Sequence, residues 1–275
     1  MTTEKVKRIS LYVFCISFSL INLVPLLWMI MNAFKSEQDY AVNPFGLPKE
    51  WVWGNFKTAW ESAGLTQFFI NSMIVTIIAT VVTVILGALA SYFITRFDFK
   101  ILKWVKALFL LGMLIPIHAT LVPVFLMMNE VGLSNSRIAL IFPYIAFNLP
   151  ITIFILSGFM STIPKDIEES ATIDGCSIFR VFRSIILPIT LPSVATVTIL
   201  NFIYNWNEFL FALVLINDSA LKTLPLGLTS FVGVETASYT LQMAALTLAL
   251  IPTIVVYLFM EKQLVNGMSA GAVKG

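Results

Sequence analysis

The chain has 275 residues, of which 58% are hydrophobic and only 12% are charged. Soluble domains carry about 25% charged residues, so this composition indicates a polytopic membrane protein. The net charge of +2 is too small to suggest a nucleic-acid partner. Two cysteines offer no disulfide framework, and the single histidine, His118, excludes multi-histidine metal sites. No G-x-x-x-x-G-K-[ST] motif is present, so the chain has no P-loop for ATP hydrolysis.

Six apolar stretches are long enough to cross the membrane, because about 20 apolar residues span ~30 Å of hydrocarbon. In chain order they cover residues 9–33, 68–93, 107–128, 138–160, 186–216 and 241–260. The first stretch is too long for a secretory signal and no A-x-A pattern follows it, so we expect an uncleaved span. Pro116 and Pro123 interrupt the third, since proline removes a helical hydrogen bond. The predicted fold class is therefore an all-α membrane protein with six transmembrane helices.

The longest polar stretch, residues 35–66, follows the first span and carries three tryptophans. Asn55 is placed to cap a short helix that ends near Gly64, and its aromatic side would suit a membrane–water interface. Two interpretations remain open for this segment. It is either a contact for an external partner or an interfacial helix that seals the bundle.

The distribution of basic residues predicts which side of the membrane each loop faces. With the N-terminus inside, twelve lysines and arginines lie in the cytoplasm and five lie outside. The positive-inside rule applies to loops as short as these. We therefore expect both termini, and the loop between the fourth and fifth spans, to be cytoplasmic.

That loop, residues 164–188, holds seven charged residues in an otherwise apolar chain, and we call it the elbow. Its pattern predicts two short helices joined by a tight turn. Pro164 suits a first helical position, with acids in the turn that follows, and Gly175 suits a left-handed cap. Ser177 can cap the second helix, which is expected to end at Leu187-Pro188. Each helix has an apolar face that requires burial, so the segment is interpreted as a docking surface. The alternative interpretation is a solvated loop at the membrane surface.

Four segments of the chain form an ordered set of motifs. In the elbow they comprise Glu169, Ser170, Ala171, Asp174, Gly175, Ile185, Ile186, Leu187 and Pro188. Residues 206–210 (WNEFL), 223–228 (TLPLGL) and 267–275 (GMSAGAVKG) complete the set. Together they resemble permease subunits of binding-protein-dependent ABC importers, and within the carbohydrate branch the smaller, maltose-type permease. Ser170 and Cys176 stand where alanine is usual; both are small, so neither disturbs the pattern.

This resemblance covers essentially the whole chain and implies the type I ABC importer permease fold. The implied function is that of the membrane subunit of an ATP-driven sugar or oligosaccharide importer, which works by alternating access. The implied partners are a second homologous permease, two cytoplasmic ATPase subunits that hold ATP and Mg, and an extracellular sugar-binding protein. The chain itself would be no enzyme, would bind no cofactor or metal, and would lie in a bacterial or archaeal cell membrane.

In that family the elbow docks in a cleft of the ATPase subunit and couples its closure to the transport path. The residues assigned here to this coupling are Glu168, Glu169, Ser170, Ala171, Asp174, Gly175, Arg180, Leu187 and Pro188. They fit the role because glycine permits a sharp turn, the apolar side chains can fill a groove, and the charged side chains can orient the joint.

Glu208 is the only acid inside a predicted span. An ionisable group in hydrocarbon costs at least ~2.5 kcal/mol, so it normally faces a cavity or a partner. With Asn205, Trp206 and Asn207 it could bind a sugar by hydrogen bonds and ring stacking. These four residues are the candidate substrate path. The alternative, a structural polar network that joins helices at the subunit interface, remains open.

The C-terminal tail, residues 263–275, is expected to be too polar and glycine-rich to span the membrane or pack as a helix. The resemblance implies that it reaches the ATPase dimer interface, whereas composition alone favours a frayed terminus. The residues assigned to this contact are Gly267, Ser269, Gly271 and Lys274. The expected organisation is therefore residues 1–67 for the first span and external loop, 68–262 for the permease domain, and then the tail.

The sequence disfavours two other classes of protein. A stand-alone secondary transporter should show an inverted repeat and more intramembrane ionisable groups, and the sequence shows neither. An intramembrane enzyme would need a nucleophile–base or metal pair inside its spans, which one histidine cannot supply. Among ABC substrates, glycerol phosphate or another polar solute is the alternative to a sugar. A phosphate would favour arginine or lysine along the path, and none lies deep in a predicted span.

Overall fold

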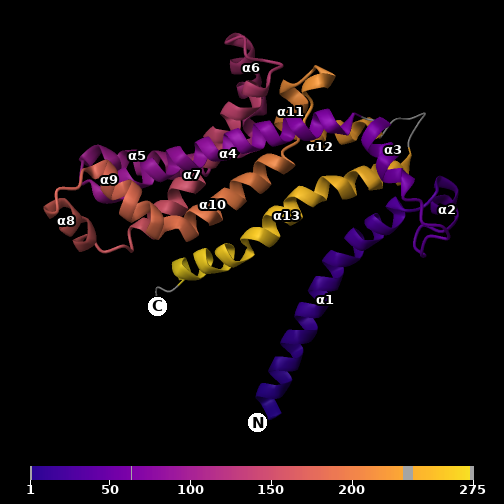
Figure 1. Ribbon diagram of the computed structural model, residues 1–275, viewed down its shortest axis with the longest axis horizontal. Helices are drawn as coiled ribbons and strands as arrows, with labels where there is room; N and C mark the ends of the chain where they lie inside the picture. Colours follow the sequence, from indigo (N-terminus) through magenta and orange to yellow (C-terminus); the bar gives the residue numbers. More distant parts are fainter. Residues whose placement is uncertain (1, 63, 232–237, 273–275) are drawn as a thin grey trace. The chain divides into compact units, whose positions relative to one another are not determined.

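The computed structural model describes residues 2–62, 64–231 and 238–272, and their regular structure is helical (Figure 1). The first half of the chain forms α1 (Thr2–Ala33), α2 (Glu37–Val42), α3 (Gly54–Ser62), α4 (Leu65–Arg96), α5 (Lys100–Gly112), η1 (Ile117–Thr120) and α6 (Leu121–Glu130). The second half forms α7 (Arg137–Met160), α8 (Asp166–Ile173), α9 (Ile178–Val181), η2 (Phe182–Ile186), α10 (Leu187–Asn207), α11 (Leu210–Leu215), η3 (Ser219–Leu221), α12 (Leu224–Gly227), η4 (Leu228–Phe231) and α13 (Tyr239–Ala272). These helices form two compact units. The first unit is Met1–Thr66 with Gly227–Ile251, and the second is Gln67–Leu226 with Pro252–Gly275.

Among the described residues, five single helices are long and apolar enough to cross a membrane, and α5 with α6 forms a sixth, bent candidate. The break between α5 and α6 lies at residues 113–116, and the two halves differ in direction by 95°. Pro116 ends this break, as expected for a residue without a backbone donor, and Pro123 lies in the first turn of α6. The prediction of an all-helical membrane protein is confirmed, and the predicted third span corresponds to this bent pair, which is either one broken span or a re-entrant loop.

The fifth span differs from the predicted 186–216. Helix is continuous from Ile178 to Asn207, so the second arm of the elbow is the beginning of the span and does not end at Pro188. The π-turn η2 explains this continuity. It bonds the Leu187 amide to the Phe182 carbonyl, one residue beyond α-helical spacing, immediately before the proline that cannot donate. The span then ends at Glu208, because the backbone of this residue is extended. The chain continues as the separate helix α11 from Leu210.

The prediction that the tail is not helical is also wrong. Helix α13 continues to Ala272 and so includes Gly267, Ser269 and Gly271. Once a long apolar helix exists, each further residue adds a hydrogen bond, which outweighs the ~1 kcal/mol that a glycine costs. Lys274 lies outside the described residues.

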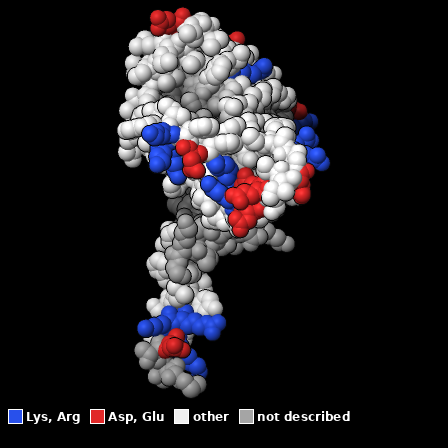
Figure 2. Space-filling view, turned by 90° about the vertical axis from the view of Figure 1, so that its left-hand side faces the viewer, with Lys and Arg blue, Asp and Glu red and all other residues white. Residues whose placement is uncertain are grey.

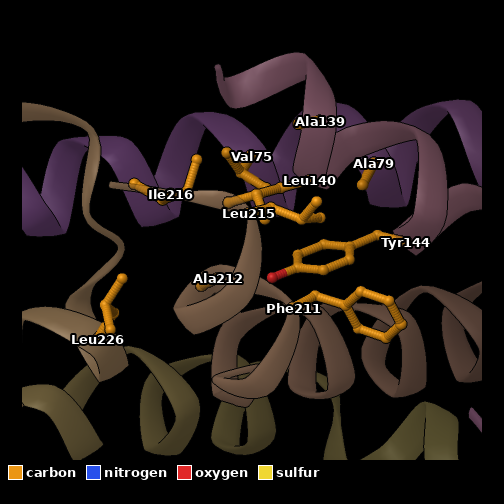
Figure 3. Packing of buried hydrophobic residues seen from close by; sticks show 10 residues of the cluster. All are labelled: Val75, Ala79, Ala139, Leu140, Tyr144, Phe211, Ala212, Leu215, Ile216 and Leu226. Carbon is orange, nitrogen blue, oxygen red and sulfur yellow. The ribbon is translucent and has the colours of Figure 1, made fainter. Parts of the chain in front are cut away.

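In the part of the second unit that the structure describes, two clusters of buried side chains join the helices. One joins α4, α7 and α11, and Figure 3 shows its members, with the Tyr144 hydroxyl directed toward α11. The other joins the C-terminal part of α4, the end of α7 and the two arms of the elbow. Gly87 allows α4 and α7 to approach closely, since a Cβ added there would lie 2.5 Å from the Thr152 methyl group. The elbow is therefore packed onto the helix bundle.

In the first unit, an aromatic cluster surrounds the end of α1. Phe34 lies 5.1 Å from the Trp51 ring and 4.7 Å from the Trp53 ring. Asn55 does not cap α3 as predicted. Its amide donates to the carbonyls of Ala33 and Lys35, because the end of α1 offers unpaired acceptors.

Also in the first unit, Glu37 caps the start of α13. Its Oε1 accepts hydrogen bonds from the Ser238 hydroxyl and from both the amide and the hydroxyl of Thr240. A carboxylate is favoured at this position because a helix N-terminus presents unpaired amides and partial positive charge. The contact joins two segments 201 residues apart in sequence.

We expect Glu37→Gln to destabilise the protein at neutral pH, and the deficit relative to wild type to shrink in acid. Burial alone would raise the pKa of the Glu37 carboxyl, but hydrogen bonds from Ser238, Thr240 and Tyr239 lower it below its ordinary value. A lowered pKa stabilises the fold above the unfolded value, about 4.3 for glutamate, and this contribution is lost as pH falls through the folded value. Thermal unfolding midpoints across this pH range test the prediction. Glu50→Gln, at an exposed acid of the same unit, is the control, and equal deficits for both variants would contradict it.

Candidate functional site

The turn of the elbow is built by hydrogen bonds that close the end of α8. The Cys176 amide donates to the Ala171 carbonyl and the Gly175 amide donates to the Thr172 carbonyl, each at 3.0 Å. This pair of bonds requires a left-handed residue at the turn, and Gly175 has φ +80°. The predicted glycine cap is confirmed. Pro164, however, precedes α8 by two residues and is not its first position.

The second arm begins as the sequence predicts. The Ser177 hydroxyl accepts a hydrogen bond from the Arg180 amide, which is the usual bond of an N-cap serine. Arg180 itself is exposed. Local hydrogen bonds on either side of Gly175 therefore define the turn between the two arms.

The outer side of the elbow exposes large apolar side chains beside charged ones. Ile173 is 86% exposed, and Phe179 and Ile178 are 64% and 55% exposed. Glu169 and Asp174 are exposed beside them. Figure 2 shows acidic and basic side chains gathered on the face that carries α8 and α9. Such a mixture of exposed apolar and charged groups is typical of a protein-binding surface.

The inner side of the elbow is packed against the bundle. Ala171 is 8% exposed and Val181 is 2% exposed, and both belong to the cluster with α4 and α7. Leu187 is half-buried and Pro188 is exposed. Ser170 is exposed, and its hydroxyl donates to the Asp166 carbonyl within α8. The assigned coupling residues thus divide between an outer and an inner set.

Glu168 belongs to the inner set, and its partners come from the end of α4. Its Oε1 lies 2.5 Å from the Arg96 Nε, and its Oε2 accepts a hydrogen bond of 3.3 Å from the Tyr92 hydroxyl. Arg96 also donates to the Ile163 carbonyl at 3.2 Å. Sequence reasoning did not single out Arg96 or Tyr92. The one available signal was an arginine in the last turn of a span, which is common for other reasons.

The candidate substrate path lies where α10 ends. Asn205 and Trp206 are buried, at 5% and 2% exposure, whereas Asn207 is exposed and donates to the Ile203 carbonyl. Glu208 is half-buried. The four residues are adjacent in sequence, but their side chains do not share one environment.

A polar network joins α10 to α4 and α7. The Asn148 amide donates to the Asn205 Oδ1 at 2.8 Å, and the Asn205 amide donates to the Thr80 hydroxyl at 3.1 Å. One turn earlier in α10, the Asn201 amide donates to the Thr152 hydroxyl at 3.0 Å. Buried amides require such partners in an apolar environment. Asn205 is therefore part of a helix-joining network within this chain.

Glu208 holds the restart of the chain as α11. Its carboxylate accepts hydrogen bonds from the amides of Phe211 and Ala212, at 2.8 and 3.2 Å. The Tyr144 hydroxyl of α7 donates to the same group at 2.6 Å. These three donors compensate a negative charge within an apolar segment. Among the residues that the structure describes, no group of three or more histidine, cysteine or acidic side chains is arranged to hold a metal.

Solved structures share this helical arrangement. A bacterial ABC transporter involved in the import of the acidic polysaccharide alginate matches with a TM-score of 0.83, covering 95% of this chain and 98% of that chain at 20% identity. The MetNI methionine ABC transporter matches with a TM-score of 0.54 over 78% of this chain and 96% of that chain, at 18% identity. The fold is therefore that of an ABC importer permease.

The family follows from the sequence. Residues 83–269 match the model for the binding-protein-dependent transport system inner membrane component, and the chain belongs to this family. It is 34% identical to the diacetylchitobiose uptake system permease protein NgcG of Streptomyces coelicolor, covering 93% of this chain and 85% of the relative. It is 33% identical to the trehalose/maltose transport system permease protein MalG of Thermococcus litoralis, covering all of both chains. The chain is thus a multi-pass carbohydrate-type ABC permease, and not an enzyme.

Proposed function

We propose that this chain forms, with a second permease, the path of an ATP-driven sugar or oligosaccharide importer that works by alternating access. The similar proteins whose names state a substrate include permeases for diacetylchitobiose, melibiose/raffinose/stachyose and trehalose/maltose. A binding protein outside would deliver the sugar, and two ATPase subunits inside would hold ATP and Mg. The elbow and both chain termini would face the ATPase subunits, as the basic residues predict.

The observation that carries this proposal is the outer side of the elbow. It presents Ile173 and Phe179 to solvent on a turn that local hydrogen bonds define. A cleft in an ATPase subunit would cover these apolar groups, and Glu169, Asp174 and Arg180 would orient the joint. Movement of the cleft on ATP binding would then shift the elbow. Coupling of this kind requires that the ATPase bind the two conformations of the permease with different affinity.

The remaining assigned residues have supporting roles in the proposal. Gly267, Ser269 and Gly271 at the end of α13 would extend the ATPase contact. Asn207, the exposed member of the candidate path, would contact the sugar beside the exposed Tyr204, while Asn205 and Trp206 would shape the wall behind them. Aromatic rings and amides are the groups that bind neutral sugars, by stacking and by hydrogen bonds.

We expect Ile173→Asp to weaken assembly of the permease with its ATPase subunits by about tenfold or more. A buried interface anchor contributes roughly 1–2 kcal/mol, and a carboxylate in its place would also be desolvated. Val42→Asp is a matched control, because Val42 is a similarly accessible aliphatic residue, 79% exposed, on the proposed external side. Co-purification of ATPase subunits from detergent measures the effect. Equal recovery with both variants would contradict docking through the elbow.

A further inference from the structure

The elbow has an inner attachment as well as an outer surface. Glu168 and Arg96 have side chains that are 13% and 6% exposed, so their ion pair is largely removed from solvent. The neighbouring ion pair of Lys165 and Asp98 is different. The Lys165 Nζ lies 3.9 Å from the Asp98 Oδ2, and the two side chains are 54% and 98% exposed. An exposed pair of this kind contributes little, whereas removal of one partner from a buried pair leaves an uncompensated charge.

The same turn of α4 contacts both arms of the elbow. Tyr92, 3% exposed, donates to Glu168 of α8 and packs its ring 5.1 Å from Phe182, which belongs to the second arm. Arg96 in addition bonds the Ile163 carbonyl, at the entry to the elbow. With the Glu168–Arg96 ion pair, four contacts from one helix end therefore hold the entry, the first arm and the second arm.

We propose that the Glu168–Arg96 pair, with Tyr92, fastens the elbow to α4 so that the two move as one rigid body. Glu168 is then a positioning residue that passes the displacement of the elbow to the second span, and it does not contact the ATPase. This inference rests on the proposed function, since it describes how ATP-driven movement reaches the transport path. It separates Glu168 from its neighbour Glu169, whose side chain is exposed on the outer side.

The expected effect of Glu168→Gln is uncoupling. The transporter, reconstituted with its ATPase subunits and binding protein, should retain its ATPase subunits and hydrolyse ATP, while sugar transported per ATP falls about tenfold or more. Arg96→Gln should behave in the same way. The double variant Glu168→Leu/Arg96→Met should recover part of the lost transport of sugar per ATP. An apolar pair can replace a buried ion pair without leaving a lone charge. Asp98→Asn, which removes the exposed pair, should transport as wild type.

A distance measurement tests the rigid body directly. Spin labels at Thr172 of α8 and Ile85 of α4, both exposed, are placed in a chain with Cys15 and Cys176 replaced by serine. Wild type should give one narrow distance that is the same without nucleotide and with ATP trapped, and Glu168→Gln should broaden it. A distance that changes with nucleotide in wild type, or full coupling in Glu168→Gln, would overturn the inference. If instead no variant, including wild type, shows ATPase activity stimulated by the binding protein, the proposed function itself fails and this inference fails with it.

Discussion

Replacing Gly175 by proline is expected to abolish ATP-driven uptake while leaving the membrane domain folded. Proline fixes φ near −65°, whereas Gly175 has φ +80° and donates a hydrogen bond to the Thr172 carbonyl. The substitution therefore forbids the turn and removes one of its two bonds. We take the free-energy cost of forming the turn with proline as about 3 kcal/mol. Such a cost lowers the population of the docking geometry by more than a hundredfold.

Gly132→Pro is a closely matched control for this prediction. Gly132 also has a positive φ, +69°, has open space around it, and donates to a carbonyl three residues earlier, that of Asn129. It lies between α6 and α7, away from the elbow. Uptake and binding-protein-stimulated ATPase activity should disappear only in Gly175→Pro. Equal losses in both variants would show that general strain, and not the elbow, is responsible.

The second large effect is expected for Glu208→Leu, which should lower the thermal stability of the purified subunit as well as its uptake. The substitution removes the acceptor of three hydrogen bonds. It leaves the amides of Phe211 and Ala212 and the hydroxyl of Tyr144 without this acceptor. Each buried polar group left without a partner costs roughly 1–3 kcal/mol. The midpoint of thermal unfolding in detergent should therefore fall by several degrees.

Tyr144→Phe provides the comparison, because it removes one of the three bonds and leaves both backbone donors with their acceptor. Its effect on the midpoint should be in the same direction and smaller. If Glu208→Leu leaves the midpoint unchanged and only weakens sugar binding, Glu208 is a substrate ligand and not the cap of α11.

The features that could be predicted from the sequence are those that neighbouring residues determine. Gly175 and Ser177 define the turn of the elbow through bonds to residues at most five positions away. Apolar length likewise predicted the spans, since it needs no knowledge of what each helix contacts. Local chemistry also explains why the break at Pro116 was predicted.

The features that could not be predicted depend on partners distant in the chain. The ion pair of Glu168 joins residues 72 positions apart, and the cap that Glu37 gives to α13 spans 201 positions. Nothing near Glu168 in the sequence separates it from Glu169, although one faces the bundle and the other faces solvent. The end of the fifth span was misplaced for a related reason. Residues 186–216 are mostly apolar, so composition does not reveal a break within them. The hydrogen bonds to Glu208 show where the helix restarts.

Uptake by the reconstituted transporter, with and without ATP hydrolysis, tests most directly whether this chain belongs to an ATP-driven importer. The chain would be placed in proteoliposomes with its second permease, binding protein and ATPase subunits, in parallel with ATPase subunits whose catalytic residue is replaced. Sugar should accumulate only with active ATPase subunits and with ATP on the elbow side. Accumulation at the same rate with inactive or absent ATPase subunits would contradict this expectation and would make the chain a secondary transporter.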